Sequence, residues 1–243
     1  MSTNPNNEPP IIEFFKVSKI YAPNVRAIDK VSLSIATGEM AFLIGKSGAG
    51  KTTLLKLLCN MEHPTGGLIE VTGKEINKLT GTSLAKLRQK IGVAYQDFKL
   101  LADRTTAENI AVSMEVSYKK PALIRKRVKS LLEQLDLADK HGTITGELSR
   151  GEQQRVALAR AIANSPTIIL VDEPTGNLDA ITTEKVMKLL SQCNKAGATI
   201  LVATHDEAIF RSGRHRIFEL SRGQLVGNTP PAAPQVNATG DIS

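Results

Sequence analysis

Short runs of apolar, β-branched residues alternate with longer segments of helical periodicity along most of the chain. The short runs predict strands and the periodic segments predict helices. Such alternation is typical of an α/β fold with a mainly parallel core sheet. We expect strands at 11–17, 27–35, 40–44, 91–95, 167–171 and 199–203, and helices that begin at Lys51, Ser83, Ile124, Ser149 and Thr182.

Other regions depart from this alternation. Residues 97–147 hold two helical patterns and no convincing strand, so we expect an inserted helical subdomain. Residues 215–225 have the pattern of a hairpin that turns at Ser221–Gly223. The first ten residues are polar and rich in Pro and Asn, and residues 228–243 consist mainly of Pro, Ala, Asn, Thr and Gly, so we expect both segments to be disordered tails. The residues between them, 11–227, are expected to form one domain.

The net charge of +7 permits an acidic partner or an anionic surface. The densest basic cluster falls on a helical pattern, and the simplest interpretation is a solvated helix face, with a face near a membrane or a partner as the alternative. Aromatic residues make up only 4% of the chain and none lies within the basic run, which argues against nucleic acid as a partner. The cluster consists of Lys119, Lys120, Arg125, Lys126, Arg127 and Lys129.

The apolar runs are of strand length and fall short of the roughly 18 residues that a membrane-spanning helix needs. The first ten residues lack the basic and apolar regions of a secretory signal, so we expect the protein in the cytoplasm. Cys59 and Cys193 lie in apolar helical patterns without a nearby Cys or His at metal-ligand spacing. They are expected to be reduced structural thiols.

The segment GKSGAGKTT fits the phosphate-loop pattern G-x-x-x-x-G-K-[ST], between an apolar strand and a helix. Glycines let the backbone wrap a polyphosphate, and the N–H groups at the helix start face the anion. Lys51 is expected to reach the β- and γ-phosphates, Thr52 to offer its hydroxyl to Mg²⁺, and Thr53 to assist at the phosphates. The loop residues are Gly45, Lys46, Ser47, Gly48, Ala49, Gly50, Lys51, Thr52 and Thr53.

An acidic pair, Asp172 and Glu173, follows an all-apolar strand. Successive strand residues point in opposite directions, so the two carboxylates are expected to have different tasks. We assign Asp172 to the Mg²⁺ shell and Glu173 to polarising the attacking water. A helix N-cap or a turn acid is the alternative for either residue.

Further segments resemble the motifs of ABC ATPases over residues 11–227. Leu148–Ile162 resembles the signature motif, Gln96 the Q-loop, Asn177–Asp179 the D-loop and His205 the switch histidine. Tyr21 falls where this family places an aromatic residue that stacks on adenine. A packed aromatic is the alternative for Tyr21.

The resemblance implies ATP and Mg²⁺ as cofactors and a head-to-tail dimer of two copies. Each ATP is expected between one copy's phosphate loop and the other copy's Ser149 and Gly151. The resemblance further implies that Gln96 contacts Mg²⁺ and reports to the helical subdomain. It assigns Asp179 to coupling the two sites and His205 to the γ-phosphate and the attacking water.

One position departs from the family pattern, because Arg150 stands where glycine is usual. Arg150 either adds charge near the phosphate or occupies a tolerant, solvent-facing position, and we expect Arg150→Gly to keep turnover within about tenfold. Ser149 is also expected to cap a helix with Glu152 as its capping-box partner.

The segment Tyr95–Ala111 resembles the cell-division branch of the family. That resemblance implies a polytopic membrane partner and a location at the cytoplasmic face of the inner membrane, at the division septum. Lipoprotein-release and macrolide-export subunits share the segment DEPTGNLD and form the alternative, and a soluble ABC protein or an ATP-binding scaffold with little hydrolysis are weaker ones. The apolar residues of 98–103 are either a docking surface for the partner or internal packing.

Overall fold

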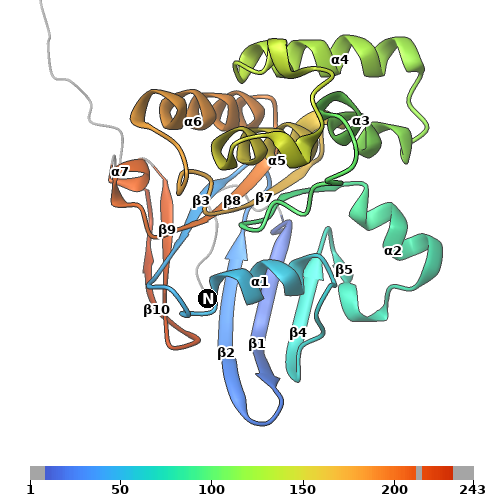
Figure 1. Cartoon of the computed structure of the whole chain (residues 1–243). Helices are drawn as coiled ribbons and strands as arrows, with labels where there is room; N and C mark the ends of the chain where they lie inside the picture. The colour runs from blue at the N-terminus through green and yellow to red at the C-terminus, as the bar shows by residue number, and fades with distance from the viewer. Residues whose placement is uncertain (1–8, 212–214, 232–243) are drawn as a thin grey trace, which may run out of the picture.

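Two sheets form the framework of the molecule, for which a computed structural model describes residues 9–211 and 215–231. The smaller sheet is antiparallel, has the strand order β2-β1-β4-β5 and lies in the lower half of Figure 1. Its strands are β1 (Ile12–Tyr21), β2 (Val25–Ile35), β4 (Gly66–Val71) and β5 (Lys74–Glu75).

The larger sheet has the strand order β10-β9-β3-β8-β7-β6. Its neighbours from β9 to β6 are parallel, and only the edge strand β10 runs antiparallel. The strands are β3 (Met40–Ile44), β6 (Ile91–Ala94), β7 (Ile168–Asp172), β8 (Thr199–Thr204), β9 (Arg216–Ser221) and β10 (Gln224–Thr229).

Helices cover both faces of the larger sheet (Figure 1). The α-helices are α1 (Lys51–Leu58), α2 (Gly81–Arg88), α3 (Thr106–Glu115), α4 (Pro121–Gln134), α5 (Arg150–Ala163), α6 (Ala180–Lys195) and α7 (Glu207–Phe210). Short 3₁₀ turns occur at Ile76–Lys78, Ala138–Lys140 and Thr145–Glu147.

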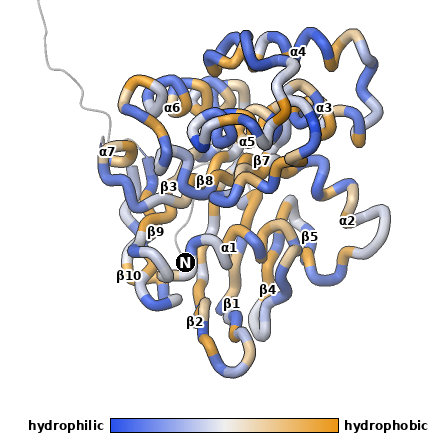
Figure 2. Tube along the Cα trace, in the orientation of Figure 1, coloured by the Kyte–Doolittle hydropathy of each residue, from blue (hydrophilic) through white to orange (hydrophobic). Residues whose placement is uncertain are grey.

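The larger sheet separates two apolar cores because alternate residues of a strand face opposite sides. In β3, Phe42 faces the core shared with α3, α4, α5 and α6, whereas Ala41 and Leu43 face the core shared with α1 and the smaller sheet. Figure 2 shows apolar residues along the central strands and a mixture of apolar and polar residues along the helices around them. Strands β7 and β8 are buried on both faces, which explains their apolar runs at 168–171 and 200–203.

The predicted fold class is confirmed, including the antiparallel sheet, the mainly parallel core sheet and the C-terminal hairpin. Residues 97–147 hold helices α3 and α4 and no named strand, as expected for the helical subdomain. Helices α2, α4 and α6 begin two or three residues earlier than predicted. The prediction began α4 at its first apolar position, whereas Pro121 at the helix start is compatible with the first turn.

The sequence patterns failed to indicate β4 and β5. Their segment, Gly66–Glu75, contains three glycines and three acidic or basic residues beside only three apolar ones. Its strand conformation depends on pairing with β1, which is distant in sequence.

The predicted disordered tail at 228–243 is wrong at its beginning. Asn228 and Thr229 belong to β10, and Asn228 accepts a hydrogen bond from Arg216 Nε at 2.8 Å. The predicted tails at 1–8 and 232–243 lie outside the described residues. Within the described residues, no helix has both the length and the apolar character needed to cross a membrane.

Candidate functional site

The phosphate loop connects β3 to α1 at the carboxyl end of the parallel strands, where open α/β sheets bind ligands. Gly50 has φ of 110°, and a Cβ there would lie 2.5 Å from the carbonyl oxygen of Ala27, so only glycine fits. The side chain of Lys51 is buried, and its Nζ donates to the Gly45 carbonyl at 2.6 Å. Lys46, Ser47 and Gly48 are exposed, Ala49 is buried, and Thr52 and Thr53 are half-buried in the first turn of α1.

The turn between β9 and β10 holds the phosphate loop from one side. Gly223 N–H donates to the Ala49 carbonyl at 3.0 Å, and the Gly223 carbonyl accepts from Asp29 N–H at 2.8 Å. This turn therefore connects the phosphate loop to β2 of the smaller sheet.

Asp172 ends β7 beside the start of α1. Thr52 Oγ1 donates to Asp172 Oδ2 at 2.7 Å, while Oδ1 is buried and has no hydrogen-bond partner in the described part of the chain. Burial raises the pKa of the Asp172 carboxyl, the Thr52 hydrogen bond opposes this rise, and the charge of Glu173 adds to it. The hydroxyl and the carboxylate thus form a pair of oxygen groups next to the phosphate loop.

Glu173 adopts a left-handed backbone with φ of 51°. Its N–H donates to the Ala203 carbonyl at 2.8 Å, and its own carbonyl accepts from Gln154 Nε2 at 2.7 Å. Non-glycine residues in this conformation persist where several contacts fix them, a situation common at active sites.

The Glu173 carboxylate contacts two further predicted site residues. Its Oε1 lies 3.3 Å from Lys51 Nζ, and its Oε2 lies 2.9 Å from His205 Nδ1. Asp172 and Glu173 therefore have separate side-chain partners. Because Glu173 lies past the end of β7 in a left-handed conformation, the alternation of strand residues does not account for this difference. His205 is exposed directly after β8.

Gln96 lies near this group through the sheet register. Ala94 of β6 pairs with Val171 of β7 in parallel, so Gln96 and Glu173 each follow the same pair by two residues. Gln96 is exposed at that edge of the sheet.

Ser149 and Asp179 occupy helix N-termini. Ser149 caps α5 and forms the predicted capping box with Glu152, whose Oε2 accepts from the Ser149 hydroxyl at 2.7 Å. Asp179 caps α6 by accepting from Thr182 N–H at 2.8 Å, and this bond lowers the pKa of its carboxyl. Within the described residues, no hydrogen bond or ion pair joins Ser149, Gly151 or Asp179 to the phosphate loop.

Tyr21 lies at the end of β1, opposite Val25 of β2. Lys19 Nζ lies 4.8 Å from the centre of its ring, as in a cation–π contact. The ring is half-buried, and its expected contact with adenine stays a prediction.

The predicted docking surface at 98–103 divides into buried and exposed parts. Phe98 is buried and Leu100 packs against the core, so the internal-packing alternative holds for these two. Leu101 is 44% exposed.

Sequence reasoning did not single out Gln154 or Arg160 as supporting residues. Gln154 is buried and holds the Glu173 carbonyl, while Arg160 Nη1 and Nη2 donate at 2.7 Å to the carbonyls of Lys99 and Phe98. Both lie on α5 within the signature segment Leu148–Ile162. Their polar side chains in a helix that also carries many apolar residues were the available signal.

Comparison with known proteins places this site in a family. The family model described as ABC transporter matches residues 28–176, which is more than half of the chain. The chain belongs to the ABC transporter ATPase family. This ABC ATPase binds and hydrolyses ATP. The matched residues include the phosphate loop and Glu173.

Curated relatives of this ABC ATPase cover most of its length. The protein is 46% identical to cell division ATP-binding protein FtsE of Mycobacterium tuberculosis, over 86% of this chain and 92% of that protein. It is 42% identical to FtsE of Escherichia coli over 89% and 98%, and 40% identical to FtsE of Bacillus subtilis over 89% and 95%.

Solved structures agree with the fold of this ABC ATPase. A dimeric ATP-binding cassette in a post-hydrolysis state, bound to ADP and Pi, superposes with a TM-score of 0.86 at 35% identity. The alignment covers 91% of this chain and 99% of that cassette.

Proposed function

We propose that this ABC ATPase is the ATP-hydrolysing subunit of a cell-division membrane complex. The observation that carries the catalytic part is the contact of Glu173 with both Lys51 and His205 beside the phosphate loop. The cell-division part is supported by relatives named FtsE that are 40–46% identical over most of their length.

The phosphate end of ATP fits the loop at Gly45–Thr53. The N-terminus of α1 supplies backbone N–H groups and the positive end of a helix dipole, and Lys51 supplies a charge. The residues also fit a magnesium ion, since the Thr52 hydroxyl and the unpaired Oδ1 of Asp172 are the oxygen donors that Mg²⁺ prefers. Gln96 is a further candidate ligand, and the ion would neutralise charge on the phosphates.

Glu173 is proposed to accept a proton from the attacking water, with His205 beside it holding the γ-phosphate and that water. The Glu173 backbone is fixed by Ala203 and Gln154, which keeps its carboxylate at the edge of the sheet. A carboxylate held at this position, beside the phosphate loop and His205, suits a general base.

The second half of each site is proposed to come from a second copy of the chain. Ser149 and Gly151 at the start of α5 offer a helix N-terminus to the partner's γ-phosphate, and Asp179 lies at a second helix start beside them in the D-loop. The dimeric cassette that resembles this chain supports such an arrangement. Tyr21 is the proposed contact to adenine.

A mixing experiment tests the head-to-tail dimer. Glu173→Gln and Ser149→Arg chains are each expected to be nearly inactive, because one removes the base and the other blocks the signature motif. In a mixed dimer, one site combines an intact phosphate loop with an intact signature motif. An equal mixture should therefore recover up to about a quarter of the wild-type rate, as random pairing of a symmetric dimer requires. No recovery would contradict a site shared between chains.

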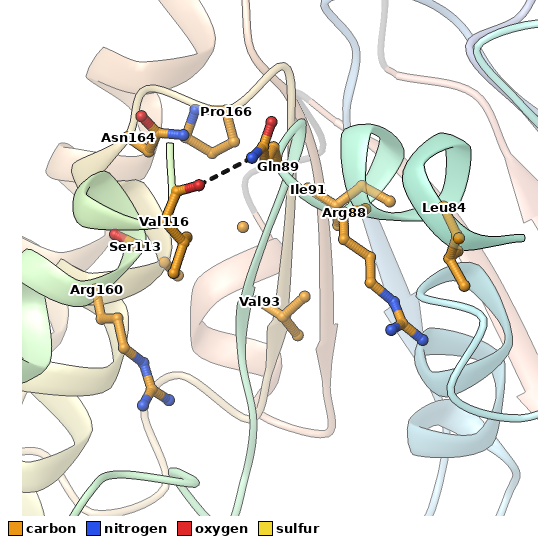
Figure 3. Close-up of a pocket in the computed structure, with 14 residues that line it drawn as sticks. Leu84, Arg88, Gln89, Ile91, Val93, Ser113, Val116, Arg160, Asn164 and Pro166 are labelled. Carbon is orange, nitrogen blue, oxygen red and sulfur yellow. Dashed lines mark hydrogen bonds between the residues drawn. The ribbon is translucent and has the colours of Figure 1, made fainter. Parts of the chain in front are cut away.

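The membrane partner is proposed to dock in the cleft between α2, β6, α3 and α5, which has a volume of about 690 Å³. Figure 3 shows Val93 near the middle of the residues that line this cleft, with Val116 and Arg160 on one side and Arg88 and Leu84 on the other. The cleft adjoins the Gln96 region through Arg160, which donates to the carbonyls of Phe98 and Lys99. A mostly apolar cleft with a few charged groups fits a short helix of a polytopic subunit.

A substitution in the cleft tests this docking. Val116 is 57% exposed and lines the cleft, so Val116→Glu should weaken co-purification of the membrane partner and leave ATP binding intact. Leu123→Glu is the matched control, because Leu123 is 50% exposed on α4 and does not line the cleft. Leu101 does not line the cleft but is exposed in the segment next to it, at 98–103, so Leu101→Glu tests whether the docking surface extends to that segment. Equal loss of ATP binding in the cleft variants would indicate misfolding instead of a lost contact.

The partner is proposed to be an FtsX-like polytopic membrane protein at the cytoplasmic face of the inner membrane, at the division septum. ATP-driven dimer closure would act through this partner to activate cell-wall hydrolases. Purification of the tagged chain from membranes in mild detergent should retrieve such a subunit. Retrieval of an exporter or lipoprotein-release subunit would contradict the division role and leave the ATPase chemistry unaffected.

A further inference from the structure

The turn after β6 contains two consecutive non-glycine residues in the left-handed conformation. Phe98 has φ of 59° and Lys99 has φ of 49°. Phe98 N–H donates to the Tyr95 carbonyl at 3.0 Å, which closes the turn. Bulky residues adopt this conformation only where the surroundings determine it strongly.

Helix α5 supplies the contacts that determine this turn. Arg160 binds the carbonyls of Phe98 and Lys99 with its two terminal nitrogens, at 2.7 Å each. At the opposite end of the helix, the guanidinium carbon of Arg150 lies 5.1 Å from the centre of the Phe98 ring. This distance is within the range of a cation–π contact, and the ring itself is buried.

Arg150 is the first helical residue of α5, directly after the capping Ser149. A positive charge is unfavourable at this end of a helix, because the helix dipole is positive there. The face of the Phe98 ring gives the guanidinium a partner that offsets this repulsion. On the other side, a Cβ at Gly151 would lie only 3.0 Å from the carbonyl oxygen of Asn177, so the motif also contacts the D-loop closely.

These contacts form a continuous path within one chain. Arg160 lines the proposed docking cleft and holds the Phe98 turn, and Phe98 contacts Arg150 in the signature motif. We propose that Arg150 is a positioning residue, which fixes the signature motif against the Phe98 turn so that the two move together. This inference rests on the proposed role of the signature motif in a shared ATP site. It also assigns the guanidinium of Arg150 to its own chain's ring and not to the phosphate.

A double-mutant cycle on the full chain tests the inference. We expect Arg150→Gly and Phe98→Leu each to lower kcat about three- to tenfold with KM for ATP changed less than about twofold, because ATP still binds the phosphate loop. The double variant should be no slower than the slower single variant, because the two single substitutions remove the same contact. Arg150→Lys should recover at least half of the lost rate, because an ammonium can also lie over the ring.

Several results would overturn it. Rate losses that multiply in the double variant would show that the two residues act independently. A loss beyond tenfold for Arg150→Gly alone, with Phe98→Leu near wild type, would place Arg150 on the phosphate. A kcat for Arg150→Gly within about 1.5-fold of wild type would show that the contact positions nothing. Thermal unfolding of each variant identifies a loss of rate that arises from misfolding. If Phe98→Leu lowers the unfolding temperature, Phe98→Met replaces it in the cycle, because methionine leaves a smaller cavity.

A second measurement separates this inference from the proposed dimer. In a Glu173→Gln background, ATP should drive dimerisation, and adding Arg150→Gly should raise the ATP concentration needed for half dimerisation about three- to tenfold. If Glu173→Gln itself does not dimerise with ATP, the proposed shared site fails. If it dimerises and Arg150→Gly changes nothing, the positioning role alone fails.

Discussion

The two halves of the proposed ATP site differ in how their polar groups are satisfied. Beside the phosphate loop, the Glu173 side chain contacts both Lys51 and His205, which come from separate elements. At the signature and D-loop motifs, Ser149 and Asp179 use their side chains to cap their own helices. The first half is a network of side chains that contact one another through Glu173, whereas the second offers helix N-termini. We therefore propose that the chemistry belongs to the first half and recognition of the phosphate anion to the second.

The largest expected effect comes from the first half. Glu173→Gln should lower ATP turnover about 10³-fold, because a positioned general base contributes 10²–10⁴. ATP binding should persist, since the amide keeps the shape of the side chain. Glu184→Gln, an exposed position on α6, is the matched control and should keep the wild-type rate. The rate of steady-state phosphate release is measured for both variants. An unchanged rate in Glu173→Gln would show that Glu173 does not act as the general base.

His205→Ala should have the next largest effect. The imidazole contacts Glu173 Oε2 and is exposed, so its loss should slow turnover about 10²-fold, as for one positioned polar group near a developing charge. The unfolding temperature should stay close to wild type, because an exposed side chain contributes little to the core. Equal losses of rate and stability would contradict a role specific to the reaction.

Ser149→Ala tests the second half and should have a smaller effect. The lost cap should reduce the free energy of unfolding by about 1 kcal/mol. Turnover should fall about tenfold, equivalent to one hydrogen bond of about 1.4 kcal/mol. Ser149→Thr preserves a capping hydroxyl and is the control. A loss of turnover as large as that of Glu173→Gln would contradict the proposed difference between the two halves of the site.

The smallest expected effect is a dependence of stability on pH at Glu152. Hydrogen bonds from the Ser149 hydroxyl and N–H lower the pKa of this carboxyl in the folded protein. The unfolded state therefore binds more protons, and the stabilisation is present above the unfolded pKa and disappears as the pH falls through the folded pKa. The difference in unfolding temperature between wild type and Glu152→Gln should shrink along that acidic range. A constant difference would show that the charge of Glu152 does not matter to the cap.

Most of the fold and the contiguous motifs could be predicted from sequence. The phosphate loop and the Asp172–Glu173 pair each combine a buried strand with polar residues at its end, and both signals are local. The capping box of Ser149 and Glu152 is local as well and was predicted. Sequence also predicted the hairpin, because its turn residues separate two short runs of apolar character.

Contacts between distant segments could not be predicted in this way. Arg150 was left between a phosphate contact and a solvent-facing position, and only the fold brings it to Phe98, fifty-two positions earlier in the chain. Gln154 likewise meets the Glu173 carbonyl because α5 packs beside the end of β7. Strand β4 has few apolar residues, and its pairing with β1 decides its conformation.

The hydrogen bond from Gly223 to Ala49 offers a way to observe the phosphate loop in solution. The donor is the amide of a turn in the C-terminal hairpin, so its hydrogen exchange measures how often that hairpin separates from the loop. A nucleotide that tightens the loop should slow this exchange without touching Gly223. The amide thus acts as a spectroscopic reporter, outside the chemistry, of how nucleotide changes the motion of the loop.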